Sequence, residues 1–305
     1  MSSIKTALID GDILVYSSAF SAEKFRYDLH LVEGEDALEF PAHSFLYRSD
    51  LTSYIQENNV SSYEVRSTLL VEPIDHALHN LKTIISSIKD KTKASNIKIF
   101  LSGKENYRNS IATFKKYKGN RDGSRIPTHK EAITDYLLRI HKAIVVDKEE
   151  ADDALGIEQC SSPFGSTIIC SSDKDLLQIP GHHFRLTDSS VVIQDSSGAD
   201  KHFYCQVMAG DSTDNIVGCP SVGPAGARKF YDPDNPWQSV LSCYRTVLSK
   251  KYPDDLVYDE SRDTVTYTVW HSGEKVTKPL VEFVIEQAQL VRIRRKQGEY
   301  WSPDE

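Results

Sequence analysis

The stretch TALIDGD at residues 6–12 is a short apolar run that ends directly in two carboxylates. Three similar runs follow it, IKIFL at 97–101, AIVV at 143–146 and STIIC at 166–170, and each has the length and composition of a buried strand. A helical stretch lies at residues 75–90, where apolar residues recur at helical spacing (Leu78, Leu81, Ile84, Ile85 and Ile88). Because strands alternating with helices favour right-handed crossovers, we expect an α/β fold with a central parallel sheet flanked by helices.

The pattern changes after about residue 200. Residues 203–231 predict two helices separated by a loop rich in Gly and Pro. Residues 263–280 alternate around a His-Ser-Gly-Glu turn and predict a β-hairpin, and residues 280–297 predict a closing amphipathic helix with a basic end. Residues 30–65 show no clear period, and we predict no element there.

Composition places the chain among globular proteins. Its 305 residues, 39% of them hydrophobic, are enough for one large domain or two small ones with a buried core. Five cysteines without a CxxC pair favour reduced thiols over disulfides or zinc. No apolar run approaches the roughly 20 residues of a membrane span, so we expect a cytoplasmic protein, in the host cytoplasm if it is viral.

Acidic residues gather after the predicted strands. Asp10 and Asp12 follow the first strand, residues 147–153 the third, and Asp173 and Asp175 the fourth. The carboxyl ends of parallel strands share one edge of a sheet, which is where ligands bind. Asp211 and Asp214 form a further pair three residues apart. Each group alone has a structural alternative as a turn, a helix cap or a solvated helix start.

The acids taken together point to metal binding. The net charge of the chain is −8, with 44 acidic against 36 basic residues, and nine clustered acids account for this excess. Such a cluster is repulsive unless divalent cations neutralise it, and carboxylate oxygens suit magnesium or manganese. The nine are Asp10, Asp12, Glu150, Asp152, Asp153, Asp173, Asp175, Asp211 and Asp214.

Basic residues gather elsewhere, at residues 104–130. This segment has eight Lys or Arg and only two acids, with Tyr107, Phe114 and Tyr117 interleaved. Cations beside aromatic rings are typical of surfaces that bind nucleic-acid backbones and bases. A solvated charged loop is the alternative for this segment taken alone.

Five motifs now stand in order: LIDGD at 8–12, YKGNR at 117–121, EADD at 150–153, SSDKDL at 171–176 and GDSTDNIVGCPSVGP at 210–224. Together they resemble the 5′ nuclease family of flap endonucleases and 5′ to 3′ exonucleases, in its bacteriophage branch. The resemblance covers roughly residues 5–232, about three quarters of the chain.

The resemblance implies a 5′ nuclease or PIN-like core and two divalent ions (Mg²⁺, which Mn²⁺ can replace). It also implies a helical arch or clamp over the active site and a helix-three-turn-helix that grips duplex DNA. It assigns metal ligands to Asp10, Glu150 and Asp152 for one ion, and to Asp173, Asp175, Asp211 and Asp214 for the other, with Asp153 beside both. It leaves Asp12 unassigned, and Glu149 lies one residue outside the motif. It assigns the scissile phosphate to Tyr117, Lys118 and Arg121, and DNA contacts to Arg108, Lys115, Lys116, Gly218, Gly223 and Gly226.

One position departs from the family pattern. The family usually has a metal-binding Asp just after the second strand, where this chain has Ser102 and Gly103, and the nearest acid is Glu105. We therefore expect weaker binding of the first metal ion.

The expected activity is metal-dependent hydrolysis of phosphodiester bonds near the 5′ ends of duplex or flapped DNA, with RNA primers in replication as a further substrate. The expected partners are DNA with a 5′ end or flap and RNA–DNA hybrids, with the chain acting as a monomer. We expect a nuclease core at residues 1–200 with a basic arch at 104–130, a DNA-binding region at 201–250, and an extension packed on the core at 251–305.

Two alternatives remain open. LIDGD and GDSTDN also resemble the acidic motifs of haloacid-dehalogenase-like phosphatases, although that fold needs a strand before GDSTDN, where FYCQVMA has helical character. A non-catalytic DNA-binding relative is the other alternative, with Ser102 as the first sign of lost activity.

Overall fold

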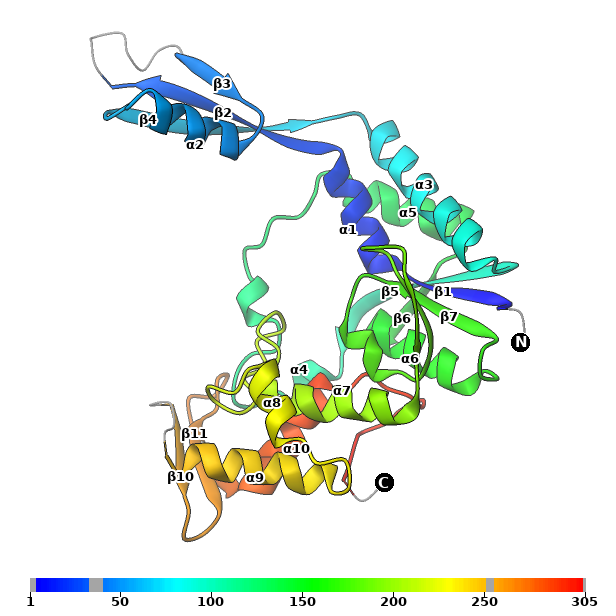
Figure 1. The fold of residues 1–305 in the computed structure, drawn as a ribbon, viewed down its shortest axis with the longest axis vertical. Coiled ribbons are helices and arrows are strands. Elements are labelled where there is room, and N and C mark those ends of the chain that lie inside the picture. Colours follow the sequence, from blue (N-terminus) through cyan, green and yellow to red (C-terminus); the bar gives the residue numbers. More distant parts are fainter. Residues whose placement is uncertain (1–3, 33–40, 251–254, 304–305) are drawn as a thin grey trace. The chain divides into compact units, whose positions relative to one another are not determined.

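A six-stranded sheet forms the centre of the computed structural model, which describes residues 4–32, 41–250 and 255–303. Its order is β6–β5–β1–β7–β8–β9, and every neighbouring pair is parallel except β8 with β9 (Figure 1). The predicted α/β fold with a central, mostly parallel sheet is therefore confirmed. The strands are β1 (Thr6–Asp10), β5 (Asn96–Asn106), β6 (Ile144–Lys148), β7 (Thr167–Ser171), β8 (Gly181–Arg185) and β9 (Val191–Gln194).

All four predicted strands are present, but they are not equally buried. Strand β7 lies between β1 and β8, and all five of its residues are buried. The expectation of a buried strand at 143–146 was wrong, because Ile144 and Val145 of β6 are 43% and 52% exposed. Strand β6 is at the end of the sheet and pairs only with β5, which leaves it open to solvent.

Helices begin directly at the sheet. Helix α1 (Gly11–Ser21) starts at the residue after β1, and a Cβ on Gly11 would lie 2.4 Å from the carbonyl oxygen of Phe100. Only glycine allows this close approach to β5. Helix α6 (Ala151–Ser161) packs its Ala151, Ala154 and Leu155 against the apolar side chains of β1, β5 and β7. A 3-10 turn at Asp175–Gln178 follows β7.

The second half of the chain forms a helical layer with its own core. The predicted pair of helices is present as α7 (Ser196–Ala209) and α8 (Pro224–Phe230), followed by α9 (Pro236–Leu248) and α10 (Leu280–Val291). The predicted hairpin is also present, as β11 (Thr264–Thr268) and β12 (Lys275–Pro279), and β10 (Leu256–Asp259) adds a third strand.

The closing helix is shorter than predicted. It ends at Val291, and the basic residues after it do not continue the helix. Arg292 and Arg294 are 7% and 5% exposed and pair with Glu299 and Glu149 respectively. The backbone is extended at Arg292, where the helix ends.

The basic segment 104–130, for which the family resemblance implies an arch or clamp, contains little helix. Helical structure within it is limited to α4 (Arg108–Ile111), the 3-10 turn Gly119–Arg121 and the first residue of α5 (Lys130–Ile140). Most of the segment makes its hydrogen bonds to distant parts of the chain instead, as described below.

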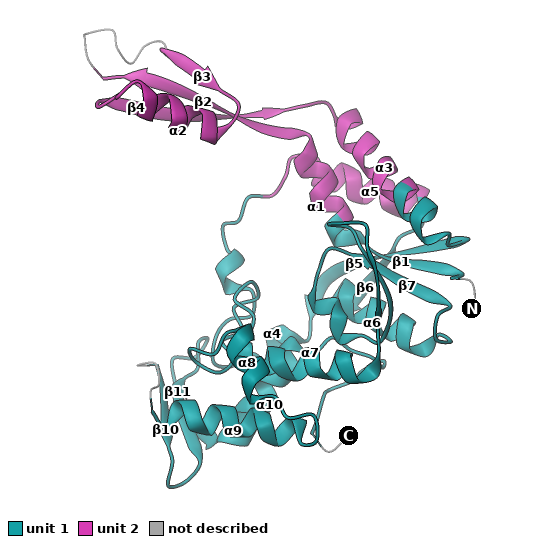
Figure 2. Cartoon of the chain, viewed as in Figure 1, with its two compact units in different colours: residues 1–13, 87–125, 141–305 teal, residues 14–86, 126–140 magenta. Residues whose placement is uncertain are grey.

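The chain divides into two compact units that interleave in sequence (Figure 2). Unit 1 contains residues 1–13, 87–125 and 141–305, and unit 2 contains residues 14–86 and 126–140. The division expected at residues 200 and 250 stays a prediction. Unit 1 contains the sheet and residues 141–305, and within it α10 packs on both α4 and α7.

Unit 2 contains a part of the chain for which the sequence predicted nothing. Strands β2 (Glu23–Leu31), β3 (His43–Phe45) and β4 (Tyr63–Val71) form an antiparallel sheet with helix α2 (Arg48–Glu57) beside it. Helix α3 (Ile74–Thr92) confirms the helix predicted at 75–90. In the described parts of the chain, none of the helices is long and apolar enough to cross a membrane.

Candidate functional site

The predicted acids of unit 1 meet at the carboxyl edge of the central sheet. Asp10 is the last residue of β1 and is 3% exposed. One of its oxygens accepts a hydrogen bond from the Ile13 N–H (3.1 Å) and the other from the Ser171 hydroxyl at the end of β7 (2.8 Å). The Ser171 hydroxyl also accepts the N–H of Asp173 (2.9 Å), so β1 and the acids after β7 are directly linked.

Crowding of these acids changes their ionisation. Burial raises the pKa of Asp10 to about 7, and the charges of Asp12 and Asp173 add to this effect. Burial also raises the pKa of Asp152 well above its usual value, and the neighbouring charges of Asp10, Asp173 and Glu150 raise it further. The structure thus brings together acids from three separate motifs.

A second group of acids continues from the first. Burial raises the pKa of Asp175 to about 7, with further contributions from the charges of Asp173 and Asp211. Asp173 accepts the N–H of Asp175 (2.8 Å), and Asp211 accepts the N–H of Thr213 (2.8 Å). A pocket of about 400 Å³ adjoins these acids, lined by Asp175 and Asp211 and also by the cations Lys174, Lys201 and Arg228.

The acids are of the residue types that bind divalent cations, but their side chains are not arranged around a common metal position. Hard carboxylate oxygens are the ligands that divalent cations prefer. The raised pKa values reflect burial and repulsion between the carboxylates, and a bound divalent cation would reduce this repulsion. Within the described residues, however, no group of three or more Asp, Glu, His and Cys side chains is arranged so that it could hold a metal ion. Two of the acids, Glu150 and Asp214, are held by side chains of the basic segment.

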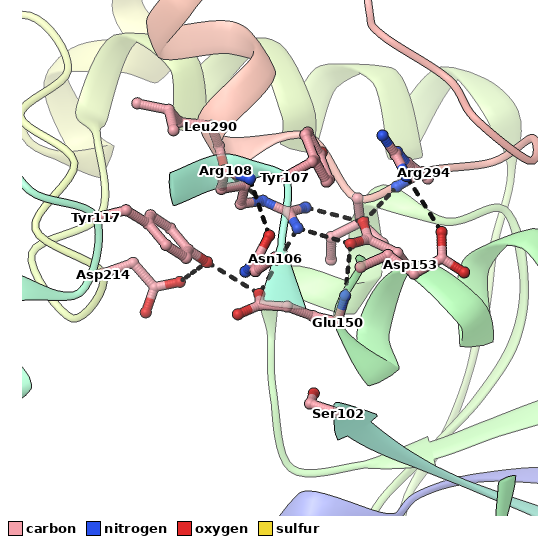
Figure 3. A network of polar contacts seen from close by, with 12 residues as sticks. Ser102, Asn106, Tyr107, Arg108, Tyr117, Glu150, Asp153, Asp214, Leu290 and Arg294 are labelled. Carbon is pink, nitrogen blue, oxygen red and sulfur yellow. Dashed lines mark hydrogen bonds and ion pairs between the residues drawn. The ribbon is translucent and has the colours of Figure 1, made fainter. Parts of the chain in front are cut away.

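Tyr117 and Lys118 lie on these two acids. The Tyr117 hydroxyl is 2.9 Å from both Glu150 Oε2 and Asp214 Oδ2 (Figure 3). Lys118 Nζ pairs with Glu150 and lies 3.6 Å from Asp214. Burial lowers the pKa of Lys118, but Glu150 and Asp214 outweigh burial and leave this pKa raised, so the lysine stays charged. Arg121 completes the group by pairing with Asp214.

Two loops interlock to hold these side chains. Lys118 donates its N–H to the Asp214 carbonyl oxygen (2.8 Å), and Asn120 Nδ2 donates to that of Ser212 (2.7 Å). Asn215 Nδ2 donates in return to the Lys116 carbonyl oxygen (2.8 Å). The motifs YKGNR and GDSTDN, about 90 residues apart in sequence, therefore form one structural unit.

Arg108, for which the sequence predicts a phosphate contact, and Asp153, which it places beside both metal ions, contact each other. They form a buried pair in which Arg108 Nη1 and Nη2 lie 2.6 and 2.8 Å from the two oxygens of Asp153 (Figure 3). Asp153 is 0% and Arg108 3% exposed. Asp153 also accepts the N–H groups of Glu150 (3.1 Å) and Arg294 (3.0 Å). These contacts use the oxygens of Asp153 and the guanidinium of Arg108 internally, which favours a supporting role over binding of metal and phosphate.

Ser102 also forms hydrogen bonds within the protein. Its hydroxyl accepts the N–H of Ala151 at the start of α6 (2.9 Å), and its own N–H lies 3.3 Å from both oxygens of Asp12. Asp12, which the motif left unassigned, is thereby oriented by β5. Glu105 is exposed and does not replace the missing acid.

The remaining residues predicted to contact DNA differ in their ion pairs and in the space around them. Lys115 pairs with Asp255, and Lys116 with Asp122 (2.6 Å). Gly218 has φ +63°, and a Cβ there would lie 2.2 Å from the backbone nitrogen of Gly210, so it is needed for loop packing. Gly223 has open space around it, and Gly226 meets only Val222 at 3.4 Å. These DNA contacts stay predictions.

Sequence reasoning missed two residues of the C-terminal region that support the site, Arg294 and Glu286. Arg294 donates to Glu149 (3.2 Å) and to Asp153, and Glu286 of α10 binds the segment that leads to Tyr117. The basic end of the last predicted helix was the signal for Arg294, but it did not reveal the partner. Glu149 lies directly before the EADD motif, which could have suggested a structural role.

Several known proteins are similar to this chain. No family model matches the chain. A 5′-3′ exonuclease of Buchnera aphidicola subsp. Schizaphis graminum is 30% identical over 200 residues, which are 59% of this chain and 63% of the relative. The corresponding protein of Buchnera aphidicola subsp. Acyrthosiphon pisum is 28% identical over 186 residues, 54% of this chain and 64% of the relative. The matches span just under two thirds of the length of these two curated relatives.

Two further proteins, one from the curated sequences and one from the solved structures, are similar to this chain. DNA polymerase I of Bacillus subtilis is 25% identical over 209 residues, which are 59% of this chain and 22% of that protein. Among solved structures, the T5 D15 protein co-crystallised with metal ions has a TM-score of 0.45 at 15% identity and covers 78% of both chains.

The fold and the site define an α/β protein that gathers carboxylates at the carboxyl edge of a parallel sheet. The curated relatives then confirm the resemblance that the motifs indicated, which is to the 5′ nuclease family.

Proposed function

We propose that this chain is a divalent-metal-dependent 5′ nuclease that hydrolyses phosphodiester bonds near 5′ ends of DNA, as a 5′ to 3′ exonuclease and flap endonuclease. The observation that carries the proposal is that acids from four separate motifs meet in unit 1 beside Lys118 and Arg121. The curated 5′-3′ exonucleases support the same activity. The proposal includes Mg²⁺ as the metal, RNA primers as a further substrate, a monomeric state and a cytoplasmic location.

The acids that would hold the metal are Asp10, Glu150, Asp152, Asp173, Asp175, Asp211 and Asp214. Bound divalent ions would supply activation of water and stabilisation of the charge that develops in an in-line displacement. The role of Asp153 is different, because it is fully used by Arg108 and by backbone N–H groups. We assign it to holding the start of α6, and with it Glu150 and Asp152.

Lys118 and Arg121 would act on the phosphate itself. In the structure they neutralise Glu150 and Asp214. If divalent ions neutralised these acids, Lys118 and Arg121 would be available to a phosphate, where they would stabilise developing negative charge. Their side chains are 27% and 47% exposed, so a phosphate can reach them from solvent.

The phosphatase alternative lacks its structural requirement. That fold needs a strand directly before GDSTDN, and the residues there belong to α7 (Ser196–Ala209). The alternative also leaves the interlocked YKGNR loop without a role.

The proposal is tested with a 5′-labelled flapped duplex, a blunt duplex and an RNA-primed duplex, each with Mg²⁺ or with a chelator. We expect small products from the 5′ end with Mg²⁺ and none with the chelator. Cleavage only at internal sites of closed circular DNA, or hydrolysis of a simple phosphomonoester alone, would contradict the proposal. Binding without any cleavage would indicate a non-catalytic relative.

The Asp173→Asn variant ties this activity to the acids. Asp173 lies beside Asp10, Asp152 and Asp175, so its loss should abolish cleavage while DNA binding stays equal or becomes tighter. The matched control is Asp188→Asn, an exposed acid in the turn between β8 and β9. Full activity of Asp173→Asn would remove Asp173 from the site.

A further inference from the structure

The C-terminal region holds the segment that carries Tyr117 and Lys118. Phe114 is 3% exposed and lies with its ring centre 5.2 Å from that of Tyr267 and 5.6 Å from that of Phe283. Ala112, Phe114 and Tyr117 all belong to the hydrophobic core formed by α7, α9, α10 and the strands β10 and β11. The apolar side chains of this segment are thus part of the hydrophobic core of the C-terminal region.

A buried carboxylate binds the backbone of this segment. Glu286 of α10 is 7% exposed, and its Oε1 accepts the N–H groups of Thr113 (2.9 Å) and Phe114 (3.3 Å). Its Oε2 accepts the Thr113 hydroxyl (2.5 Å) and the ammonium of Lys278 (2.7 Å). A carboxylate that accepts two adjacent N–H groups and is neutralised by a lysine is a strong, directional anchor.

The carbonyl side of the segment is bound as well. Trp270 donates its indole N–H to the Ala112 carbonyl oxygen (2.9 Å) and its backbone N–H to that of Thr113 (3.1 Å). Residues 112–114 lie outside regular secondary structure, so these contacts from the C-terminal region satisfy polar groups that a helix or sheet would otherwise satisfy.

The anchor is close to the reacting groups. Tyr117 follows Phe114 by three residues, and its hydroxyl lies on Glu150 and Asp214. The other side of this stretch is held by the loop at 211–216 through Lys118 and Asn120. The position of Tyr117 and Lys118 therefore depends on two supports, one of which is Glu286.

We propose that Glu286 is a positioning residue of the nuclease site, which holds residues 113–114 and through them places Tyr117 and Lys118 at Glu150 and Asp214. This inference rests on the proposed nuclease function for its kinetic consequence only. The anchor itself is a statement about the folded chain and can be measured without substrate.

The test compares Glu286→Gln with Glu282→Gln, an exposed acid one turn earlier on the same helix. The glutamine keeps the shape but turns an NH₂ group toward the Thr113 hydroxyl or the Lys278 ammonium, both of which are donors. Hydrogen–deuterium exchange at the amides of residues 112–118 should become several-fold faster in Glu286→Gln and stay unchanged in Glu282→Gln. In the flap cleavage assay, kcat should fall about ten- to a hundred-fold, since a shift of about 1 Å can cost this much, with KM changed less than about twofold.

The outcomes separate the two proposals. If the unaltered protein cleaves nothing but exchange still accelerates in Glu286→Gln, the nuclease proposal fails and the anchor stands. If exchange at residues 112–118 is the same in both variants, the anchor is refuted. If exchange accelerates while kcat, measured well below the melting temperature, equals that of Glu282→Gln, Glu286 only stabilises the fold and the positioning role is refuted.

Discussion

Lys118 is held beside the acids both by its backbone conformation and by its charge. Its backbone is left-handed (φ 55°), which directs the chain back over the acids, and its ammonium pairs with Glu150. The neighbouring acids keep its pKa raised despite burial, which by itself would lower it. In the proposed function, the same positive charge that stabilises the acids in this structure would act on a phosphate.

Replacing Lys118 by Ala should slow catalysis far more than it weakens DNA binding. We expect a fall in single-turnover rate of about 100-fold, a size typical of losing one transition-state charge contact, and a change in Kd of less than about threefold. Rate and affinity are measured on the same flapped duplex, with Lys104→Ala as the control for loss of one exposed positive charge. Equal losses in rate and affinity would make Lys118 a simple binding contact.

Ser102→Asp should couple stability to metal. The new carboxylate would stand beside Asp12, so without divalent ions we expect a loss of about 1–2 kcal/mol from like-charge repulsion. With Mg²⁺ the variant should show a larger rise in melting temperature and a half-saturation of cleavage at lower Mg²⁺, because a charged oxygen replaces a neutral one. Identical Mg²⁺ titrations of both proteins would place Ser102 outside the metal site.

At the scale of elements, the start of α6 connects the acids of the site with the segment that follows α10. It carries Glu150 and Asp152 into the site, while Asp153 on the same turn is bound by Arg108 and by the segment after α10. A Cβ on Gly156 would lie 2.4 Å from the carbonyl oxygen of Arg294, which shows how closely this segment packs on α6. The C-terminal segment is therefore part of the support of the site.

Arg108→Met should unfold the protein more easily rather than simply weaken DNA binding. It leaves the buried Asp153 charge unpaired, a change that typically costs about 3–5 kcal/mol. Arg139→Met removes the exposed pair with Asp135 and should cost less than about 1 kcal/mol. Urea unfolding of both variants measures the difference. A stable Arg108→Met protein with reduced DNA affinity would restore the predicted phosphate contact.

For the whole molecule, the crowded acids set how stability depends on pH. The pKa values of Asp10 and Asp175 are raised from the ordinary value of 3.8 to about 7, mainly by burial. Between these pH values the folded protein holds protons that the unfolded chain has released. The free energy of unfolding should therefore fall as pH rises from about 4 to 7 in the absence of divalent ions.

This dependence is measured by urea unfolding across that pH range, with chelator and with Mg²⁺. Mg²⁺ should stabilise the protein more at pH 8 than at pH 5, because it binds ionised carboxylates. The Asp10→Asn, Asp175→Asn double variant should flatten the profile. A free energy that rises from pH 4 to 7 in chelator would contradict the crowding of these acids. Asp153 acts in the opposite sense: burial would raise its pKa, but Arg108 lowers it overall, so its contribution is lost only at lower pH.

Local sequence determined the parts of this protein that depend on nearest neighbours. The four strands, the helix at 74–92, the pair α7 and α8 and the hairpin after β10 follow from apolar periodicity and turn residues. The acid motifs could be placed at one edge because parallel strands end there together. Residues 30–65 gave no such pattern, because β3 and the start of β4 are mostly exposed and Leu51 is the buried residue of α2, which leaves too few apolar positions for a period.

Only the tertiary structure decided which charges act and which support. Asp153 and Asp214 look alike in sequence, because both are acids within motifs. Burial and partners distinguish them, because Asp153 is enclosed by a guanidinium and two N–H groups while Asp214 faces Tyr117, Lys118 and Arg121. The partners Leu290, Arg294 and Glu286 come from more than 130 residues away. Burial depends on packing between distant segments, and no local spacing encodes it.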